Sequence, residues 1–331
     1  MRYFKSLTLL VLTLASCSPQ KNYTKVEGFT QGTTYSITYY DPLTRDLSEP
    51  IDSILMRIDR SMSIYNDSSI ISRVNSNISD SIDDLLKEVI VSSFDIYNQT
   101  DGAFDITVGP VVRAIGFGKD KTQGIDSAKV KQLLPLIGMN KIHLEGNRLK
   151  KDDIRIQIDV NAIAQGYTVD VIGKYLESKG IKHYLVEVGG EITARGKNAK
   201  GTDWVIGIDK PVESALPGEN IQAKISISNG YGLATSGNYR KFIEVNGQKY
   251  AHTINPKTGF PELNSLLSAT VVAPNATEAD ALATAFMVKG LDWSRSFVDK
   301  RNDIDAYLVF SDSLGNYKVW MNVGMKRRIT P

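Results

Sequence analysis

The sequence predicts an α+β fold with mixed or antiparallel sheets and flanking helices. Segments of strand composition and segments with helical spacing of apolar residues follow one another irregularly, without the strand–helix–strand rhythm of a parallel sheet. No internal repeat and no low-complexity linker divides the chain. Its 331 residues are enough for one large domain or two closely packed ones.

The first half predicts a strand pair followed by helices. Residues 26–40 have strand composition around an interruption, QGTT, at 31–34. Ser81 and Asp84 have the spacing of a capping box at a helix N-terminus. Apolar residues recur at helical spacing in three segments, 50–64, 81–99 and 125–136. A polar loop and a hairpin are expected at 61–75 and 142–158.

Residues 100–118, TDGAFDITVGPVVRAIGFG, combine many apolar side chains with several glycines and a proline. They are too apolar for a solvent loop and too interrupted for a regular element. Such segments often form the wall of a ligand site. We therefore expect residues 100–118 to line a pocket.

Residues 158–180 predict a junction between a strand and a helix. Ile154, Ile156 and Ile158 alternate as in a strand, helical spacing begins within four residues, and Gly180 is the predicted stop. The Asp159 carboxylate at the junction could accept the free N–H groups of the first helical turn. Because a helix N-terminus favours anions, the stretch fits either a phosphate site or a capped core helix.

The second half adds further strands and one helix. A hairpin is expected within 235–261, turning at Asn246-Gly247. A helix is expected at 277–289, with Thr277 and Asp280 in a capping-box arrangement. Strands are expected at 183–192, 204–209, 223–228, 268–273, 306–310 and 318–321.

The N-terminus predicts export and lipidation. Arg2 and Lys5 precede an apolar run, and the ending LASC resembles a bacterial lipobox. We expect residues 1–16 to be a lipoprotein signal peptide, Cys17 the lipidated first mature residue, and 17–25 a tether; a plain secretory signal is the alternative. This predicts a protein anchored in the bacterial cell envelope and facing the periplasm, with the inner or outer membrane left open.

Composition argues against other classes of protein. The formal net charge is only +2, and no basic run alternates with aromatic residues, so nucleic acid is not an expected partner. After residue 16 no apolar run is long enough to span a bilayer. The chain has neither a Walker-type glycine loop nor a GxGxxG after a strand, so a standard nucleotide-binding fold is not supported.

Three residues are candidates for catalysis or metal binding. Asp280 and Thr284 lie at i and i+4 of an apolar helix, where a carboxylate and a hydroxyl could bind Mg²⁺. The same pair also fits a helix cap and a hydroxyl bonding back to its own helix. Of the three histidines, His252 precedes an irregular loop where it could point into a cleft, whereas His143 and His183 fit structural or surface positions.

Seven separated motifs together resemble the ApbE family of FAD:protein FMN transferases, in that family's order. They are QGTTYSI, SMSIYNDSSIISRVN, TDGAFDITVGPVVRAIGFG, DVNAIAQGYTVD, LVEVGGEI, TSGNYRKF…YAHTINPKTGFP and ADALATAFMVKG. The resemblance covers residue 26 to the C-terminus. It implies a single catalytic domain over 26–331 with an ApbE-like, T-fold-related architecture.

The resemblance also implies a set of site residues. Asp280 and Thr284 would bind Mg²⁺ through their side chains and Ala162 through its carbonyl, while His252 matches the family's proposed catalytic residue. Tyr65 would offer an aromatic surface and Ile254 its backbone to the flavin nucleotide. The residues implied to lie against FAD are Gln31, Tyr65, Ala103, Phe104, Asp105, Asp159 and Ile254.

The sequence departs from the family pattern at Asn161 and at Gln165, where many members have a lysine. Gln165 could donate a hydrogen bond to an FAD phosphate but brings no charge. More of the charge neutralisation would then fall on Mg²⁺.

The implied reaction moves the FMN part of FAD to a Thr or Ser hydroxyl of a target protein and releases AMP. His252 is the first candidate to accept the hydroxyl proton, with Asp280 and a metal-bound group as alternatives. The implied partners are exported flavoproteins, such as subunits of membrane redox complexes. Two other functions stay open: a Mg²⁺-dependent FAD pyrophosphatase and a lipid-anchored FAD-binding protein without turnover.

Overall fold

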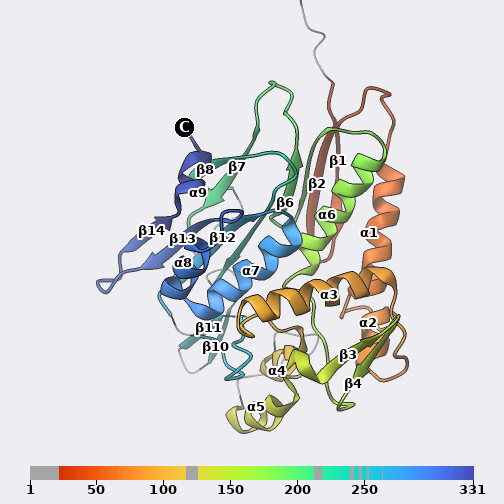
Figure 1. The fold of residues 1–331 in the computed structure, drawn as a ribbon, viewed down its shortest axis with the longest axis vertical. Helices are drawn as coiled ribbons and strands as arrows, with labels where there is room; N and C mark the ends of the chain where they lie inside the picture. The colour runs from red at the N-terminus through yellow and green to blue at the C-terminus, as the bar shows by residue number, and fades with distance from the viewer. Residues whose placement is uncertain are drawn as a thin grey trace, which may run out of the picture.

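The computed structural model describes residues 22–116, 126–211, 218–238, 242–245, 248–251, 253–262 and 264–331. Its centre is an eight-stranded sheet in the order β1-β2-β5-β6-β9-β12-β13-β14, with every neighbouring pair antiparallel (Figure 1). The expected α+β fold is therefore confirmed. The strands are Thr24–Thr30, Thr33–Tyr40, His183–Val188, Glu191–Arg195, Gly232–Gly237, Leu266–Ala273, Asp305–Ser311 and Tyr317–Met321.

Helices cover one face of this sheet and a small sheet covers the other. Helix α6 (Ala164–Ser178) packs on β5 and β6, and α7 (Ala276–Lys289) on β9 and β12. Helix α1 (Ser48–Met62) lies beside α6 (Figure 1). On the opposite face, apolar side chains of the three-stranded sheet pack against the main sheet; its strands are β7 (Trp204–Asp209), β8 (Ile221–Ile227) and β15 (Ile329–Thr330).

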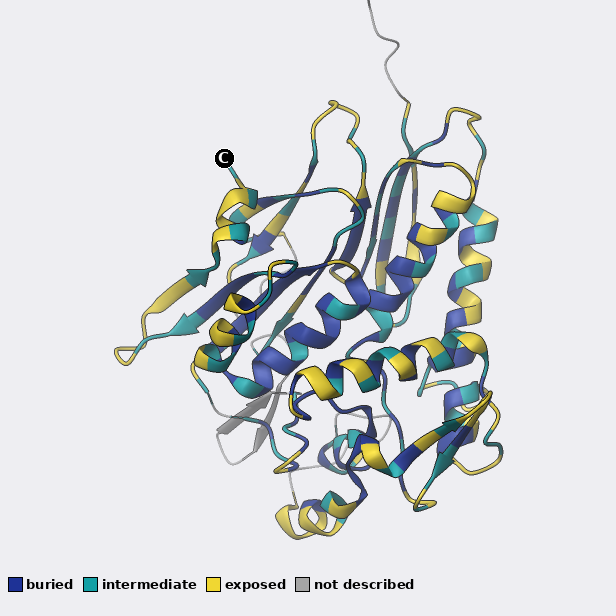
Figure 2. Ribbon diagram, in the orientation of Figure 1, coloured by how far each residue is buried: buried dark blue, intermediate teal, exposed yellow. Residues whose placement is uncertain are grey.

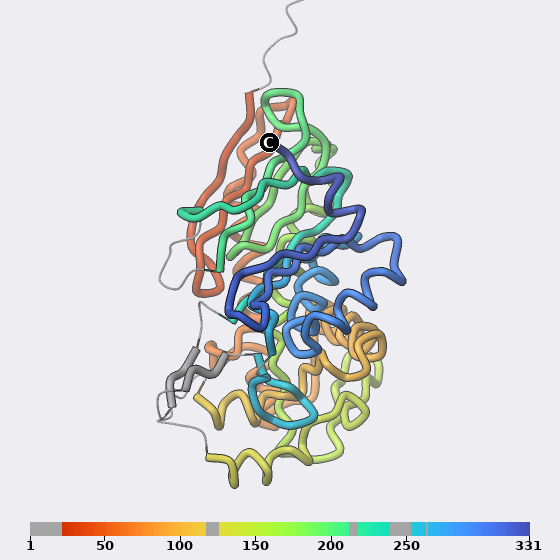
Figure 3. Tube along the Cα trace, turned by 90° about the vertical axis from the view of Figure 1, so that its left-hand side faces the viewer, coloured from red at the N-terminus to blue at the C-terminus, as the bar shows by residue number. Residues whose placement is uncertain are grey.

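A second part of the molecule lies beyond one end of the main sheet. Seen from the side, α4, α5 and the β3–β4 hairpin form the lower part of the molecule, below the sheet (Figure 3). The remaining helices of the described residues are α2 (Ile70–Asn75), α3 (Asp84–Gln99), α4 (Gly109–Ile115), α5 (Ser127–Leu133), α8 (Leu291–Asp299) and α9 (Val323–Arg328). Separate two-stranded sheets are formed by β3 (Ile142–Glu145) with β4 (Arg148–Lys151) and by β10 (Phe242–Val245) with β11 (Gln248–Ala251). Short 3₁₀ turns lie at Ile106–Val108, Leu134–Leu136 and Met139–Lys141.

Helix α7 is the most deeply buried helix of the central layer (Figure 2). Phe286 on α7 is fully buried, and the main hydrophobic cluster extends from α7 to α3 and to the loop before α6. The sheet approaches α7 closely because Gly232 on β9 has no side chain: an added Cβ would lie 1.9 Å from the Ala276 nitrogen. The start of α7 is thus fixed against the sheet.

Several expected boundaries were wrong. Residues 154–158 are not a strand: the exposed fraction of Ile154 is 72%, and no sheet partner joins it. The segment 61–75, expected as a loop, contains α2, and the segment 100–118 contains α4. Strand β1 begins at Thr24, so the last residues of the expected tether are part of the folded domain.

The capping residues were also misassigned. Asp83, not Ser81, caps α3 by accepting the Leu86 N–H. No described helix has the length and apolar character needed to cross a membrane. The expected signal peptide and Cys17 lie outside the described residues.

Candidate active site

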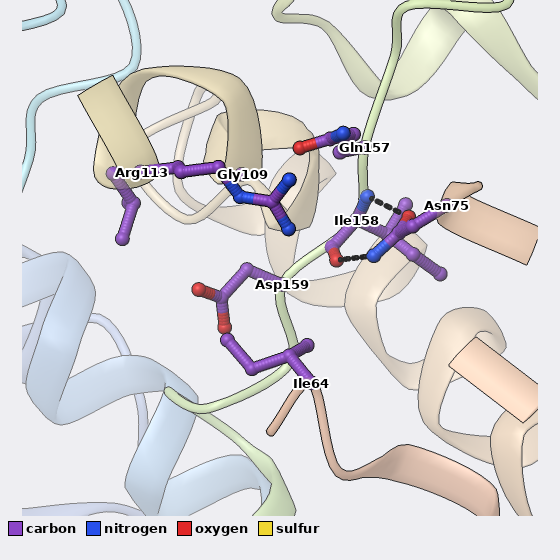
Figure 4. Close-up of a pocket in the computed structure, with 8 residues that line it drawn as sticks. Ile64, Asn75, Gly109, Arg113, Gln157, Ile158 and Asp159 are labelled. Atoms are coloured by element: carbon purple, nitrogen blue, oxygen red, sulfur yellow. Dashed lines mark hydrogen bonds between the residues drawn. The ribbon is translucent and has the colours of Figure 1, made fainter. Parts of the chain in front are cut away.

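Hydrogen bonds to the backbone hold the segment that leads into α6. Asn75, at the end of α2, donates from its side-chain amide to the Ile158 carbonyl and accepts the Ile158 N–H, both at 2.8 Å (Figure 4). The Asp159 N–H donates to the Ile106 carbonyl at 2.7 Å. Because these bonds come from two other parts of the chain, they fix Asp159 in space without a strand partner.

Asp159 does not cap α6, contrary to the sequence-based expectation. The helix begins at Ala164, and no side chain caps it. Asp159 Oδ1 instead accepts the Asn161 N–H at 2.9 Å. Burial raises the pKa of the Asp159 carboxyl, while the Asn161 N–H and the charge of Arg113 act in the opposite direction. The carboxylate therefore sits in a partly desolvated place beside a cation.

Tyr65 and Arg113 lie next to Asp159. Tyr65 is 56% exposed. Burial, and then the neighbouring Asp159 carboxylate, raise the pKa of its hydroxyl. Arg113 extends from α4 into the space between Gln157 and Asp159, where it lines a pocket of about 20 Å³ (Figure 4). The sequence reasoning missed Arg113, although it is the one basic residue in the segment predicted to form a ligand wall.

Asp280 lies at the contact between α6 and α7. Its Oδ2 accepts the Gly166 N–H at 3.1 Å, and this is the one hydrogen bond that the described residues give the carboxylate. Gly166 permits the close approach, since an added Cβ would lie 2.3 Å from the Ala276 carbonyl oxygen. Burial, and to a smaller extent the negative charge of Asp170, raise the pKa of Asp280 to about 7, against the effect of the Gly166 N–H.

Thr284 follows Asp280 one turn later on α7. Its hydroxyl lies 3.3 Å from the Ser236 hydroxyl on β9 and does not bond back to its own helix. The cap of α7 is Asn275, which accepts the Glu278 N–H. The capping role considered for Asp280 is therefore wrong, and its carboxylate faces α6 instead.

The Asp280 site fits a hard cation. A buried carboxylate with a single N–H donor lacks compensating positive charge, and a hydroxyl oxygen lies one turn away. Ala162, the predicted carbonyl ligand, is partly buried and lies four residues before Gly166. Among the described residues, no three His, Cys, Asp or Glu side chains gather into a metal-binding group.

Two glutamines lie near the start of α6. Gln31, in the β1–β2 turn, adopts a positive φ of 50° and donates from Nε2 to the Thr168 hydroxyl at 2.7 Å. Gln165 Nε2 lies against the β5–β6 turn, 2.6 Å from where a Cβ on Gly189 would be. Gln31 from the β1–β2 turn and Gln165 on α6 itself therefore place uncharged hydrogen-bonding groups along the first two turns of α6.

The predicted residues of the segment 103–105 are buried. Ala103 and Phe104 pack in the main core, while Asp105 Oδ1 accepts the Thr107 N–H at 2.7 Å. Burial raises the pKa of the Asp105 carboxyl. Ile254 is buried in a small cluster beside α4, and its backbone bridges to Pro261. Contact of these residues with FAD stays a prediction.

The three histidines separate into two groups. His143 Nε2 lies 2.9 Å from an Asp152 carboxylate oxygen, and His183 Nδ1 accepts the Lys197 N–H at 2.9 Å. Both contacts are structural, as the sequence indicated. His252, the catalytic candidate, lies outside the described residues.

Comparison with known proteins shows the family of this chain. The family model described as the ApbE family matches residues 31–308. The chain belongs to the ApbE family. Its ApbE relatives include the FAD:protein FMN transferase of Haemophilus influenzae, 35% identical over 324 residues, with 92% of each chain covered. The FAD:protein FMN transferase of Escherichia coli is 35% identical over 318 residues, covering 92% of this chain and 88% of the relative.

A solved structure supports the same assignment. The flavin transferase ApbE from Vibrio cholerae matches with a TM-score of 0.83 and 32% sequence identity. The match covers 93% of this chain and 99% of that chain. The ApbE-like architecture expected from the motifs is confirmed.

Proposed function

We propose that this ApbE-family chain is an FAD:protein FMN transferase. The transferred group is the FMN part of FAD, and the acceptor is a Thr or Ser hydroxyl of a target flavoprotein. Relatives that match nearly the whole chain carry this activity in their names. The observation in the structure that supports it best is the contact of the buried Asp280 carboxylate with the Gly166 N–H at the start of α6.

The reaction breaks the phosphoanhydride bond of FAD and forms a phosphoester bond to the acceptor. The acceptor oxygen attacks the phosphorus on the FMN side of the pyrophosphate, and the bond from that phosphorus to the bridging oxygen breaks. AMP leaves with the bridging oxygen, and FMN stays on the acceptor as a phosphoester. The acceptor proton passes to a base, for which His252 is the first candidate. Asp280, whose pKa is raised to about 7, is the alternative.

The residues around α6 would bind and orient FAD. Asp280, Thr284 and the Ala162 carbonyl would hold Mg²⁺, which when bound supplies positive charge beside the pyrophosphate. Gln31 and Gln165 offer N–H donors to phosphate oxygens at the first turn of α6.

In the segment that leads into α6, Asp159 would be an acceptor for an amino or hydroxyl group of the nucleotide. Tyr65 beside it supplies an exposed aromatic ring against which a flat base can stack.

An acceptor-labelling assay tests the function. Protein lacking residues 1–17 is incubated with FAD, Mg²⁺ and an exported flavoprotein. We expect flavin fluorescence on the acceptor band in a denaturing gel, together with one AMP per flavin transferred. Release of FMN and AMP without labelling would instead identify a pyrophosphatase, and FAD binding without AMP a carrier.

Substitution of Asp280 tests the metal assignment. Asp280→Ala removes the carboxylate, so Mg²⁺-dependent AMP release should be lost. Asp84→Asn changes an exposed carboxylate on α3 and is the matched control. Full activity of Asp280→Ala at low Mg²⁺ would refute the assignment.

We also propose a lipid anchor at Cys17 that holds the enzyme at a membrane of the bacterial cell envelope, facing the periplasm. Its acceptors there would be exported flavoproteins, such as subunits of membrane redox complexes. The test is membrane fractionation of cells that express the full chain or Cys17→Ser. We expect the full chain in the membrane fraction and the variant in the soluble one. An unchanged distribution would refute the anchor.

A further inference from the structure

Asp170 on α6 connects this helix to the first residues of α7. Its Oδ1 accepts the Ala276 N–H at 3.0 Å, and its Oδ2 accepts the Thr277 N–H at 2.8 Å and the Thr277 hydroxyl at 2.6 Å. Asp170 is 9% exposed. A nearly buried carboxylate with three donors from one helix start is a strong, directional link, because charged acceptors form the strongest hydrogen bonds of this kind.

This link is paired with the one at the Asp280 site. Asp170 bonds Ala276 at the start of α7, and Asp280, four residues further along α7, bonds Gly166, four residues earlier along α6. The two contacts are therefore one helical turn apart on both helices, about 6 Å along each axis. Two such contacts fix both the sliding and the rotation of α7 against α6.

The start of α7 has a cap without the Asp170 link. Asn275 already caps this helix by accepting the Glu278 N–H, and Gly232 lets the sheet meet Ala276 directly. Nor does Asp170 line the pocket beside Asp159. It borders a groove of about 790 Å³ between α3, α6 and the start of α7.

We propose that Asp170 is a positioning residue: its bonds to Ala276 and Thr277 set α7 on α6 so that Asp280 faces the α6 entry as a metal ligand. This inference rests on the proposed Mg²⁺ site. Asp170 itself touches neither the substrate nor the ion. It acts through the placement of Asp280, so its loss should weaken metal binding in molecules that are still folded.

The experiment measures metal binding directly, without FAD. The probe is Mn²⁺, and electron paramagnetic resonance measures how much of it is bound. Asp170→Asn keeps the shape of the side chain but removes its charge. The new amide NH₂ group is a donor, so it cannot accept the hydrogen bonds that Ala276 and Thr277 donate to Asp170. We expect Mn²⁺ affinity to fall about tenfold or more, which is typical when a group that orients a metal ligand is removed. Asp84→Asn, the same exchange in the same groove, should leave the affinity unchanged.

A milder pair of variants keeps the inference testable if Asp170→Asn does not fold. Thr277→Val removes one of the three bonds and should weaken Mn²⁺ binding by a smaller factor, whereas Thr277→Ser keeps the hydroxyl and should restore it. Thermal unfolding of each variant without metal reports stability separately.

The outcomes separate this inference from the proposed function. If Asp280→Ala abolishes Mn²⁺ binding but Asp170→Asn and Thr277→Val bind as tightly as the parent, Asp170 has only a structural role and the inference is overturned. If Asp280→Ala also binds Mn²⁺ normally, the metal site itself is wrong.

Discussion

A single methyl group at Gly166 should separate α6 from α7. The Cβ of Gly166→Ala would lie 2.3 Å from the Ala276 carbonyl oxygen and 2.8 Å from Asp280 Cβ. Neither atom is the end of a flexible side chain, so the helices must move apart. Alanine gains about 1 kcal/mol of helix propensity over glycine. Overpacking costs about 1–3 kcal/mol. We therefore expect a net loss of about 0–2 kcal/mol in the free energy of unfolding.

Gly173, on the same helix, provides the control. A Cβ there would lie 3.1 Å from the Tyr184 hydroxyl and 3.2 Å from Thr193 Cγ2. Both are side-chain atoms, and a shift of a few tenths of an ångström accommodates the methyl group. Gly173→Ala should therefore be as stable as the parent or up to about 1 kcal/mol more stable.

The decisive difference between the two variants lies in metal binding. Movement of α7 in Gly166→Ala stretches the Gly166 N–H bond to Asp280, so Mn²⁺ affinity should fall about tenfold. Gly173→Ala should bind within twofold of the parent. Urea unfolding measures the stability of both variants and Mn²⁺ titration the site. If Gly166→Ala binds Mn²⁺ like Gly173→Ala, the close contact of the two helices does not shape the metal site.

Four further predictions concern the same region. A proton must leave the Asp280 carboxyl before a cation binds, and the pKa of this carboxyl is raised to about 7. The apparent Mg²⁺ affinity at pH 6 should therefore be about tenfold below the plateau that it reaches at high pH. In the metal-free protein, the free energy of unfolding should fall as pH rises from 3.8 through about 7, because the folded state holds the Asp280 proton more tightly than the unfolded state does. Asp280→Asn should lose the pH dependence of both Mg²⁺ affinity and stability. A flat pH profile in the parent protein would contradict these two predictions. Asn75→Ala leaves the buried Ile158 N–H and carbonyl unpaired, so it should cost about 1–3 kcal/mol in urea unfolding and weaken FAD binding measured by fluorescence. The control is Asn77→Gly, which removes an exposed bond of the same segment and suits the positive φ of 59° there, so it should change both quantities little. Gln165→Lys should alter the FAD dissociation constant modestly, and an unchanged value would mean that Gln165 does not face the phosphates.

Local patterns predicted the elements better than their ends. The sequence was enough to place Asp280 and Thr284 on one face of α7, because residues i and i+4 share a helix face. The sequence was not enough to identify the capping residues. Each helix start offers two good candidates, Ser81 or Asp83 for α3 and Thr277 or Asn275 for α7, and packing decides which one caps the helix.

The region around Asp159 shows what sequence spacing does not contain. The alternating isoleucines before Asp159 resemble a strand. The backbone of this segment nevertheless bonds no strand of the described residues: the Ile158 N–H donates to the Asn75 side chain and the Asp159 N–H to the Ile106 carbonyl, both from other parts of the chain. For a similar reason, the sequence alone did not identify Arg113 as a site residue. Its position beside Asp159 follows from the packing of α4 on the entry segment, which no local periodicity encodes.

With a lipid anchor at Cys17, the position of the β1–β2 hairpin would limit where this enzyme can work. The chain enters β1 at the end of the hairpin far from the start of α6, whereas Gln31 in the turn bonds α6 itself (Figure 1). Seven residues of β1 span about 24 Å. From Cys17 to Thr24 an extended chain adds at most about 25 Å. An enzyme anchored at Cys17 would therefore reach acceptor hydroxyls only within about 50 Å of the membrane surface, which favours flavoproteins held at that same membrane.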